Sequence, residues 1–449
     1  MKPTAALVAL LVLLSASVAH AQSSGSPDAA AQDLIRQTLL YGIDSQVLDA
    51  IQKLRASGDK TFTRELASLL TDQRAPAVQT AVLELLRDQD LRDGEDAAKA
   101  ILSSPDGVPS DLLSAAIHYA SAIKMEGQLA LLTPLVDSTD AAASSAAIRA
   151  LGTSGDPGAV TLLLAKLKDP GFPDGRRNDV ILALGDLKSS QATEQLAAIA
   201  KNADEDQVRR LYAADSLGKI GDAQALPVLK GMFAEPSALV RAYAASALAN
   251  FSLDDVLPML VSGLKDENDK VRLECAKALA RTMSSSQAAS AVPVLSYKAR
   301  FDPVGTVRVQ SIQTLGSIGT DACFPVLRDL YTAAGSSMDG REAALTALVA
   351  KWLPQSLPSI RDVVGQGVLQ VDQRILEITG RILATAKDPG LREVYASLLG
   401  SKSAAARYSA IQGIAANRFS DLKDRVKKVA DTDPAGAVRQ QAQAALSQL

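Results

Sequence analysis

The sequence is poor in the residues that carry most enzymatic and metal chemistry. Its 449 residues include two histidines, two cysteines and one tryptophan, and only 4% are aromatic. Sheet proteins are enriched in aromatic and β-branched residues, so this composition disfavours a β-sandwich or β-barrel. The formal net charge is −3. A nucleic-acid binder normally carries a basic excess that neutralises phosphates, so nucleic acid is not an expected partner.

The first 21 residues, MKPTAALVALLVLLSASVAHA, have the features of a secretory signal peptide. Lys2 precedes an apolar stretch at residues 5–14, and the segment ends in the A-x-A form that a signal peptidase cleaves. The stretch is shorter than the roughly 20 apolar residues of a membrane-spanning helix. We therefore predict a cleaved signal peptide (1–21), no integral membrane segment after cleavage, and a periplasmic or secreted protein. An uncleaved anchor is the alternative interpretation.

An internal repeat runs through most of the chain. The strings VRRLYAADSLG, VRAYAASALAN, VRLECAKALAR, VRVQSIQTLGS and VRQQAQAAL resemble one another closely. An arginine recurs every 31 to 36 residues, at Arg177, Arg210, Arg241, Arg272, Arg308, Arg341, Arg374, Arg407 and Arg439. A proline recurs with the same period, at Pro227, Pro258, Pro293, Pro325 and Pro358, and once earlier at Pro134. A repeat of this length indicates an array of stacked supersecondary units.

Each repeat contains the pattern of two short helices. Alanine and leucine follow the arginine at i, i+3, i+4 and i+7, which is an apolar stripe of helical period. We expect this first helix to close at a residue such as Gly152, Gly185, Gly218, Asn250 or Gly316. We expect the second helix to have its proline in the first turn. Two such helices cannot bury both apolar faces alone, so the sequence predicts an all-α solenoid of about eleven to twelve stacked repeats.

These strings, summarised as VR…AA.ALG…G…A.P.L…L.D, resemble HEAT repeats of the short form found in the phycobilisome-lyase-like HEAT group. The resemblance covers residues 75–449 well and residues 31–74 poorly. It implies the solenoid fold but no single activity, because that group includes scaffolds, adaptors and a few enzymes. The landmarks of tetratricopeptide repeats are absent.

The ends of the array depart from the repeat pattern. We expect a disordered leader at residues 22–30, which read QSSGSPDAA, and an atypical helical cap at residues 31–74. The repeat solenoid then occupies residues 75–449, and its last helix is rich in glutamine.

The arginine ladder, defined as the nine recurring arginines above, admits two interpretations. It could form a basic stripe for an anionic partner. We favour a structural role instead, because each arginine faces an acidic residue near a repeat boundary, and a guanidinium group suits hydrogen bonds to carboxylates and carbonyls. Replacing Arg272 with alanine is then expected to lower thermal stability.

The few reactive side chains give no catalytic constellation. His118 lies among apolar residues, and without a second histidine after signal cleavage a relay can only be built around it. The iron site of deoxyhypusine hydroxylase, a HEAT-like enzyme, uses His-Glu pairs, and the sequence has none. Cys275 and Cys323 are expected to be separate buried thiols, with a disulfide as the alternative. We expect no enzyme activity, no metal and no cofactor.

Among the exposed positions, those on the proline-bearing helices are the candidates for partner binding. In the HEAT family the second helices usually line the concave side, which implies that Lys230, Tyr297, Arg328 and Arg361 lie there. Such a mixed strip suits an extended peptide or the flank of a protein. The alternative is an ordinary solvated helix face.

The sequence therefore predicts a non-catalytic, exported scaffold or adaptor that binds an unidentified protein or extended peptide. The alternative, from the resemblance, is a lyase-like enzyme accessory or a ligand-handling chaperone. A polysaccharide binder ranks last, because sugar sites usually use aromatic platforms that this sequence can hardly supply.

Overall fold

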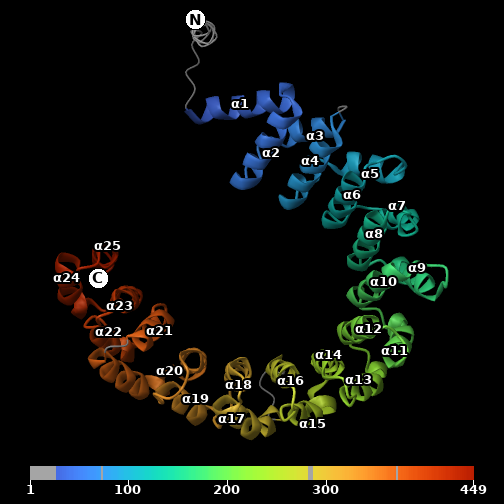
Figure 1. The fold of residues 1–449 in the computed structure, drawn as a ribbon. Coiled ribbons are helices and arrows are strands. Elements are labelled where there is room, and N and C mark those ends of the chain that lie inside the picture. Colours follow the sequence, from blue (N-terminus) through green and yellow to red (C-terminus); the bar gives the residue numbers. More distant parts are fainter. Residues whose placement is uncertain (1–26, 72–73, 282–286, 371–372) are drawn as a thin grey trace, which may run out of the picture. The chain divides into compact units, whose positions relative to one another are not determined.

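The computed structural model describes residues 27–71, 74–281, 287–370 and 373–449, and all regular elements in these ranges are helical (Figure 1). They comprise 25 α-helices and five short 3₁₀ helices, as the repeat pattern predicts. None of the helices in these ranges is both long and apolar enough to cross a lipid bilayer. The predicted signal peptide at residues 1–21 lies outside the described residues.

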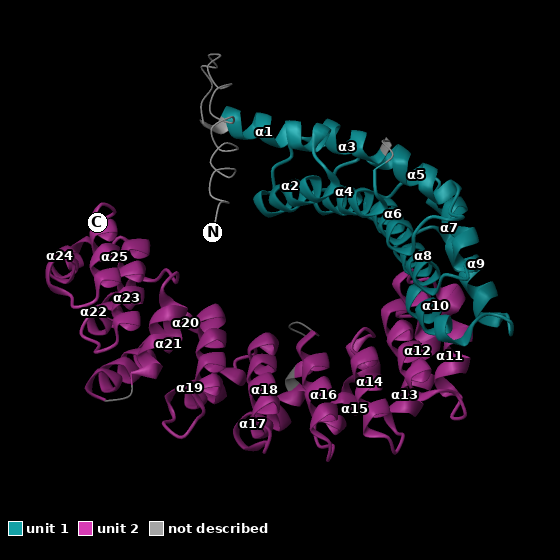
Figure 2. Cartoon of the chain, turned by 45° about the horizontal axis from the view of Figure 1, so that its top comes forward, with its two compact units in different colours: residues 1–183 teal, residues 184–449 magenta. Residues whose placement is uncertain are grey.

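The helices form two compact units, residues 1–183 and residues 184–449 (Figure 2). The boundary falls within one helix, α10 (Asp174–Asp186). The helices before it are α1 (Pro27–Tyr41), α2 (Asp44–Ser57), α3 (Thr63–Thr71), α4 (Pro76–Asp88), α5 (Glu95–Ser103), α6 (Ser110–Ala122), α7 (Gln128–Val136), α8 (Ala141–Thr153) and α9 (Pro157–Lys168).

The second unit continues the helical repeats. Its helices are α11 (Thr193–Lys201), α12 (Gln207–Ile220), α13 (Leu226–Phe233), α14 (Ala238–Leu248), α15 (Leu253–Gly263), α16 (Asp269–Arg281), α17 (Val292–Phe301), α18 (Gly305–Ile318), α19 (Cys323–Thr332), α20 (Met338–Leu369), α21 (Arg374–Leu383), α22 (Arg392–Leu398), α23 (Ala404–Asn417), α24 (Lys423–Thr432) and α25 (Gly436–Leu446).

Within the second unit the helices alternate between two layers, and the proline-bearing helices lie on the outer side. Successive arginine-bearing helices (α12, α14, α16, α18) pack directly against one another, whereas successive proline-bearing helices (α13, α15, α17, α19) touch far less. Helices on the inside of a curved stack lie closer together, and Figure 2 shows α12, α14, α16 and α18 on that inner side. The expectation that the proline-bearing helices line the concave side is therefore wrong.

Small residues set the spacing of the inner layer. The sequence predicts that four glycines close their helices, and the structure shows that none of the four has a left-handed conformation: Gly152, Gly185, Gly218 and Gly316. They let the next helix approach closely: a Cβ on Gly218 would lie 2.7 Å from the Cα of Ala247. The left-handed caps of α12 and α18 come three residues later, at Gly221 (φ 71°) and Gly319 (φ 64°).

Three prolines lie where the repeat pattern places them and others do not. Pro227, Pro293 and Pro325 lie in the first turn of α13, α17 and α19, where a missing N–H costs no hydrogen bond. Pro134 and Pro258 lie inside α7 and α15. In α20 two helices of one repeat run together across a kink at Trp352, whose φ of −134° and ψ of 33° are not helical.

The N-terminal helices α1, α2 and α3 occupy the segment in which the sequence predicts an atypical helical cap, residues 31–74. Helix α1 begins at Pro27, so the last residues of the expected leader, 27–30, are helical. An ion pair between Arg36 and Glu65 joins α1 to α3 within this segment. A second one, between Arg55 and Asp88, joins α2 to α4 of the first repeat.

Candidate functional site

His118 lies on the exposed side of α6 and has no hydrogen-bond partner among the described residues. Partial burial is the main cause that lowers the pKa of its imidazole, and the nearby Arg87 and Arg149 lower it further. A catalytic histidine is normally oriented by a second group through a hydrogen bond. The surroundings of His118 supply no such group.

The two cysteines are free thiols, each buried in a different helix. Burial raises the pKa of the Cys275 thiol, with Asp266 and Glu274 adding to the effect. Since the thiolate is the nucleophile and the metal ligand, Cys275 is held in its unreactive form. Among the described residues there is no group of three or more His, Cys, Asp or Glu side chains that could hold a metal ion.

The arginines of the ladder reach back to the loop that precedes their own helix. In four of them Nη1 donates to two successive carbonyl oxygens of that loop, as Arg272 does to Asp266 and Glu267 at 2.9 Å each. The others with this arrangement are Arg241, Arg308 and Arg407, and Arg439 makes one such bond. These bonds hold the loop between the proline-bearing helix of one repeat and the arginine-bearing helix of the next.

The same arginines reach forward to a carboxylate in the loop that follows the proline-bearing helix of their own repeat. Nε and Nη2 of Arg272 donate to the two oxygens of Asp302 at 2.8 and 2.9 Å, and both side chains are buried. The same two-pronged pairing joins Arg241 to Asp266 and Arg407 to Asp433, and Arg210 pairs with Glu235. The guanidinium groups of Arg241, Arg272 and Arg407 therefore each join two successive loops between repeats.

Three members of the ladder differ. Arg177 donates only to carbonyl oxygens of its own loop, apart from a loose ion pair with Asp174 at 3.7 Å. Arg341 donates through Nε to the carbonyl of Tyr331 and lies over its ring, and burial lowers the pKa of its guanidinium. Arg374 is the first residue of α21.

The structure does not bring the four predicted partner-binding residues together. Lys230 is half-buried on α13. Arg361 lies on the second half of α20, where it pairs with Glu393 and donates to the carbonyl of Gly390. The other two, Tyr297 and Arg328, lie on the successive outer helices α17 and α19.

An exposed aromatic pair on α17 is the most distinctive feature of this outer surface. Tyr297 is 59% exposed, and Phe301, one helical turn further on, is 63% exposed. Their ring centroids are 5.3 Å apart, and the ammonium of Lys298 lies 5.9 Å from the Tyr297 ring. Phe301 is not among the residues predicted from the sequence, although its i+4 spacing from Tyr297 indicates that the two share one face of a helix.

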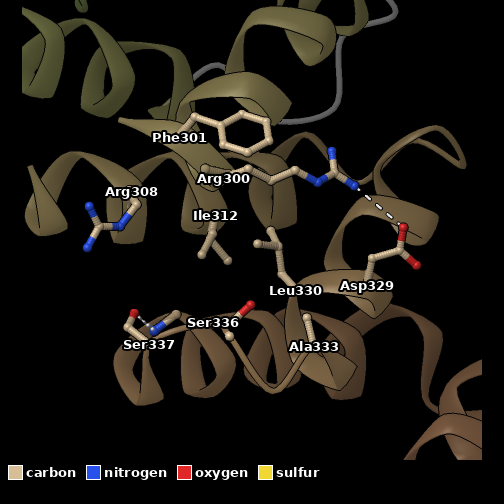
Figure 3. A pocket seen from close by; sticks show the side chains of 12 residues that line it. Arg300, Phe301, Arg308, Ile312, Asp329, Leu330, Ala333, Ser336 and Ser337 are labelled. Atoms are coloured by element: carbon tan, nitrogen blue, oxygen red, sulfur yellow. Dashed lines mark hydrogen bonds and ion pairs between the residues drawn. The ribbon is translucent and has the colours of Figure 1, made fainter. Parts of the chain in front are cut away.

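Next to Phe301 lies a pocket of about 520 Å³ between this repeat and the following one (Figure 3). Its apolar wall includes Phe301, Ile312 and Leu330. Its polar rim includes Arg300, whose Nη2 lies 3.5 Å from Asp329, and the ladder residue Arg308. Its floor is the loop between α19 and α20, at residues 333–337.

We define the α17–α19 surface as this pocket together with Tyr297 and Arg328. The side chain of Arg328 is 43% exposed and donates to the carboxylate of Asp329 at 2.7 Å. Arg300, Arg308 and Arg328 outnumber Asp329, the one carboxylate among the residues that line the pocket. The surface therefore combines exposed aromatic rings with positive charge, which suits an acidic and apolar partner segment.

Comparisons with known proteins agree with the fold. A sequence model of the family described as "Spirochaete HEAT repeat protein" matches residues 39–445. No curated protein matches the chain.

Solved structures of similar fold have little sequence identity to the chain. Yeast importin-β (Kap95p) is 14% identical with a TM-score of 0.58, and the match covers 95% of this chain and 67% of that one. A second Kap95p structure, determined with RanGDP, is 12% identical with a TM-score of 0.52 and coverages of 93% and 60%. The CpcE–CpcF phycocyanin lyase of Nostoc is 20% identical with a TM-score of 0.34, and the match covers 57% of this chain and 94% of that one.

Proposed function

We propose that this chain, which belongs to the Spirochaete HEAT repeat protein family, is a non-catalytic, exported scaffold that binds another protein through the α17–α19 surface. The observation that carries the proposal is the exposed pair of Tyr297 and Phe301 beside a pocket with a basic rim. Aromatic residues and arginine are enriched at protein interfaces and in their energetic hot spots.

The state of the reactive side chains supports the non-catalytic part of the proposal. Cys275 is a buried thiol of raised pKa, and His118 has no hydrogen-bonded partner among the residues described. The fold supports the scaffold part, because a stack of helical pairs offers a long surface to a partner. One solved structure of similar fold is a complex of Kap95p with Nup1.

Export is supported by the sequence of residues 1–21. The test is N-terminal sequencing of the protein recovered from the producing cell, for which we expect Gln22 as the first residue. A chain that still carries residues 1–21 would contradict a cleaved signal.

Site-specific photo-crosslinking tests the binding surface. A photoreactive amino acid in place of Tyr297 should give a discrete crosslinked protein, and charge reversal at Arg328 and at Arg300, which lines the pocket, should reduce its yield. Lys427→Glu is the matched control, because Lys427 is exposed on α24, in another repeat. The proposal fails if position 297 gives no crosslinked protein, or if the reversals and the control have equal effects.

A further inference from the structure

The ladder pairs each of several arginines with a carboxylate that follows the next proline-bearing helix, and at Arg308 that carboxylate is missing. Asp302 and Asp433, which bind Arg272 and Arg407, are the residues that end helices α17 and α24. The corresponding residue at the end of α19 is Ala333.

The backbone shows that the three positions are equivalent. Ala333 has φ −65° and ψ 122°, Asp302 has φ −60° and ψ 133°, and Asp433 has φ −63° and ψ 134°. Each donates its backbone N–H to the carbonyl four residues earlier, at 2.9, 3.1 and 3.0 Å. Only the side chain differs.

Arg308 itself is held as the paired arginines are. Its Nη1 donates to the carbonyls of Asp302 and Pro303, at 2.7 and 3.1 Å. Its Nε and Nη2, the atoms that bind a carboxylate in Arg272 and Arg407, have no partner among the residues described. Figure 3 shows the Arg308 side chain at the pocket.

A backbone N–H near Ala333 also lacks the carboxylate that its counterparts in other repeats bind. The carboxylates of Asp302 and Asp433 also accept from the N–H two residues further on, that of Val304 at 3.1 Å and that of Ala435 at 2.9 Å. The equivalent N–H at the α19–α20 loop belongs to Gly335, and it too has no partner in the described part of the chain. Gly335, Ala333 and Arg308 all line the pocket.

We propose that this pocket binds a carboxylate supplied by an extended segment of a partner protein, in the place where the other repeats use their own aspartate. The inference rests on the proposed function and specifies the chemistry of its partner. A two-pronged arginine–carboxylate pair is among the stronger polar contacts in proteins and is selective for planar anions. The pocket supplies the two donors of Arg308, Nε and Nη2, together with the N–H of Gly335 and an apolar wall.

The size and surroundings of the pocket favour a peptide over a small acid. Its 520 Å³ exceeds the room that one carboxylate needs. Phe301 and Tyr297 continue the surface beyond the rim. The expected segment therefore places an aspartate, a glutamate or a terminal carboxylate beside an aromatic or aliphatic side chain.

The first test needs no ligand. Ala333→Asp should restore the missing carboxylate and raise the melting temperature of the full chain by about 2 °C, while the same change in an Arg308→Ala background should not. An equal change in melting temperature in the two backgrounds would show that Nε and Nη2 of Arg308 do not bind the new carboxylate, and it would overturn the proposal.

The second test uses peptides. A random heptapeptide library displayed on phage is selected on the full chain, and the enriched peptides are synthesised with a fluorescent label. We expect acidic sequences with an aromatic or aliphatic neighbour, and a loss of affinity of about tenfold or more on both Arg308→Ala and Ala333→Asp. Arg439→Ala is the matched control, because it removes a ladder arginine outside the pocket.

The other outcomes are decisive as well. Loss of binding on changing the peptide's acid to its amide assigns a side-chain carboxylate, and loss on C-terminal amidation assigns a terminal one. Peptides without an acidic group, affinity unchanged by Ala333→Asp, or succinate that binds as tightly as the peptides would overturn the proposal. A crosslinked partner at position 297 that is captured equally by Ala333→Asp would overturn this inference and leave the scaffold function standing.

Discussion

Arg272 and Asp302 show what one pair of the ladder contributes. Their side chains are 6% and 0% exposed, and Arg272 also closes the preceding loop through two carbonyls. A buried ion pair gains little over a well-packed apolar pair, but removing one partner leaves the other charge uncompensated. The cost of breaking the pair is therefore larger than its net contribution.

Arg272→Ala should lower the free energy of unfolding by about 3 kcal/mol, because Asp302 would stay buried with only Lys298, whose Nζ lies 3.3 Å from its Oδ2, to offset its charge. Thermal and urea denaturation followed by circular dichroism measures it. Arg308→Ala is the comparison, since it removes backbone hydrogen bonds but leaves no buried carboxylate unpaired. A loss no larger than that of Arg308→Ala would contradict a central role for the ion pair.

The aspartates of the ladder should make stability depend on pH in the acid range. Hydrogen bonds from Arg241 and Arg407 are the main cause that lowers the pKa of Asp266 and Asp433. For Asp302 burial is the largest influence and acts in the opposite direction, but its hydrogen bonds, with Arg272 first, outweigh burial and also lower the pKa.

A carboxyl whose pKa is lower in the folded state stabilises the fold above the pKa of the unfolded chain, which is about 3.9 for aspartate. This stabilisation is lost as the pH falls from there through the folded-state pKa. The free energy of unfolding should therefore decrease below about pH 4, and an Asp302→Asn, Asp433→Asn variant should show a shallower decrease. Urea titrations at a series of pH values test this, and equal slopes would contradict it.

At this scale the sequence predicts the positions of the arginines but only part of their chemistry. The period places them, and the chemistry of the guanidinium group indicates carbonyl and carboxylate partners. The missing carboxylate at Ala333 cannot be predicted from the sequence, because only the backbone shows that Ala333 and Asp302 occupy the same position after their helices. The pairing of Phe301 with Tyr297 is visible in the spacing, but their exposure depends on which side of the stack α17 occupies.

At the scale of helices, glycine decides how closely the inner layer packs. Gly218 has the next inner helix against it, whereas Gly231 on the outer helix α13 has open space around its Cα. The two glycines lie in one repeat but in opposite environments.

Gly218→Ala should destabilise the protein by about 1–3 kcal/mol, because the new Cβ would press against the backbone of Ala247. Gly231→Ala, the matched control, should stabilise it by roughly 0.5–1 kcal/mol, because alanine is a better helix former and nothing obstructs it. Equilibrium denaturation of both variants measures the difference. Similar effects from the two substitutions would contradict the close packing of α12 on α14.

The repeat pattern predicts the helices well and their layer poorly. Apolar periodicity and capping residues are local, so the helices of the cap and of the repeats could be predicted from the sequence. Which layer is inner depends on how closely each layer packs on the next repeat. Gly218 and Gly316 carry that information, since close packing requires small residues, but the same glycines also suit a helix end.

For the whole molecule, the stack implies that a destabilising substitution in one repeat affects only that repeat and its neighbours. In a quasi-one-dimensional array each repeat contacts only its neighbours. Hydrogen–deuterium exchange on Arg272→Ala should therefore show faster exchange in α16, α17 and α18, with α6 and α8 exchanging as in the unaltered protein. Uniform loss of protection across both units would show instead that the chain unfolds as one cooperative body.

The only tryptophan of the sequence, Trp352, lies at the kink of α20. It is buried, and its ring centroid is 6.1 Å from that of Phe324 on α19, the helix that also supplies Leu330 to the candidate pocket. The protein therefore contains an intrinsic fluorophore in the repeat next to its proposed binding site. Its emission reports the melting of that repeat, whereas circular dichroism averages over every helix, and the gap between the two curves measures how independently the repeats come apart.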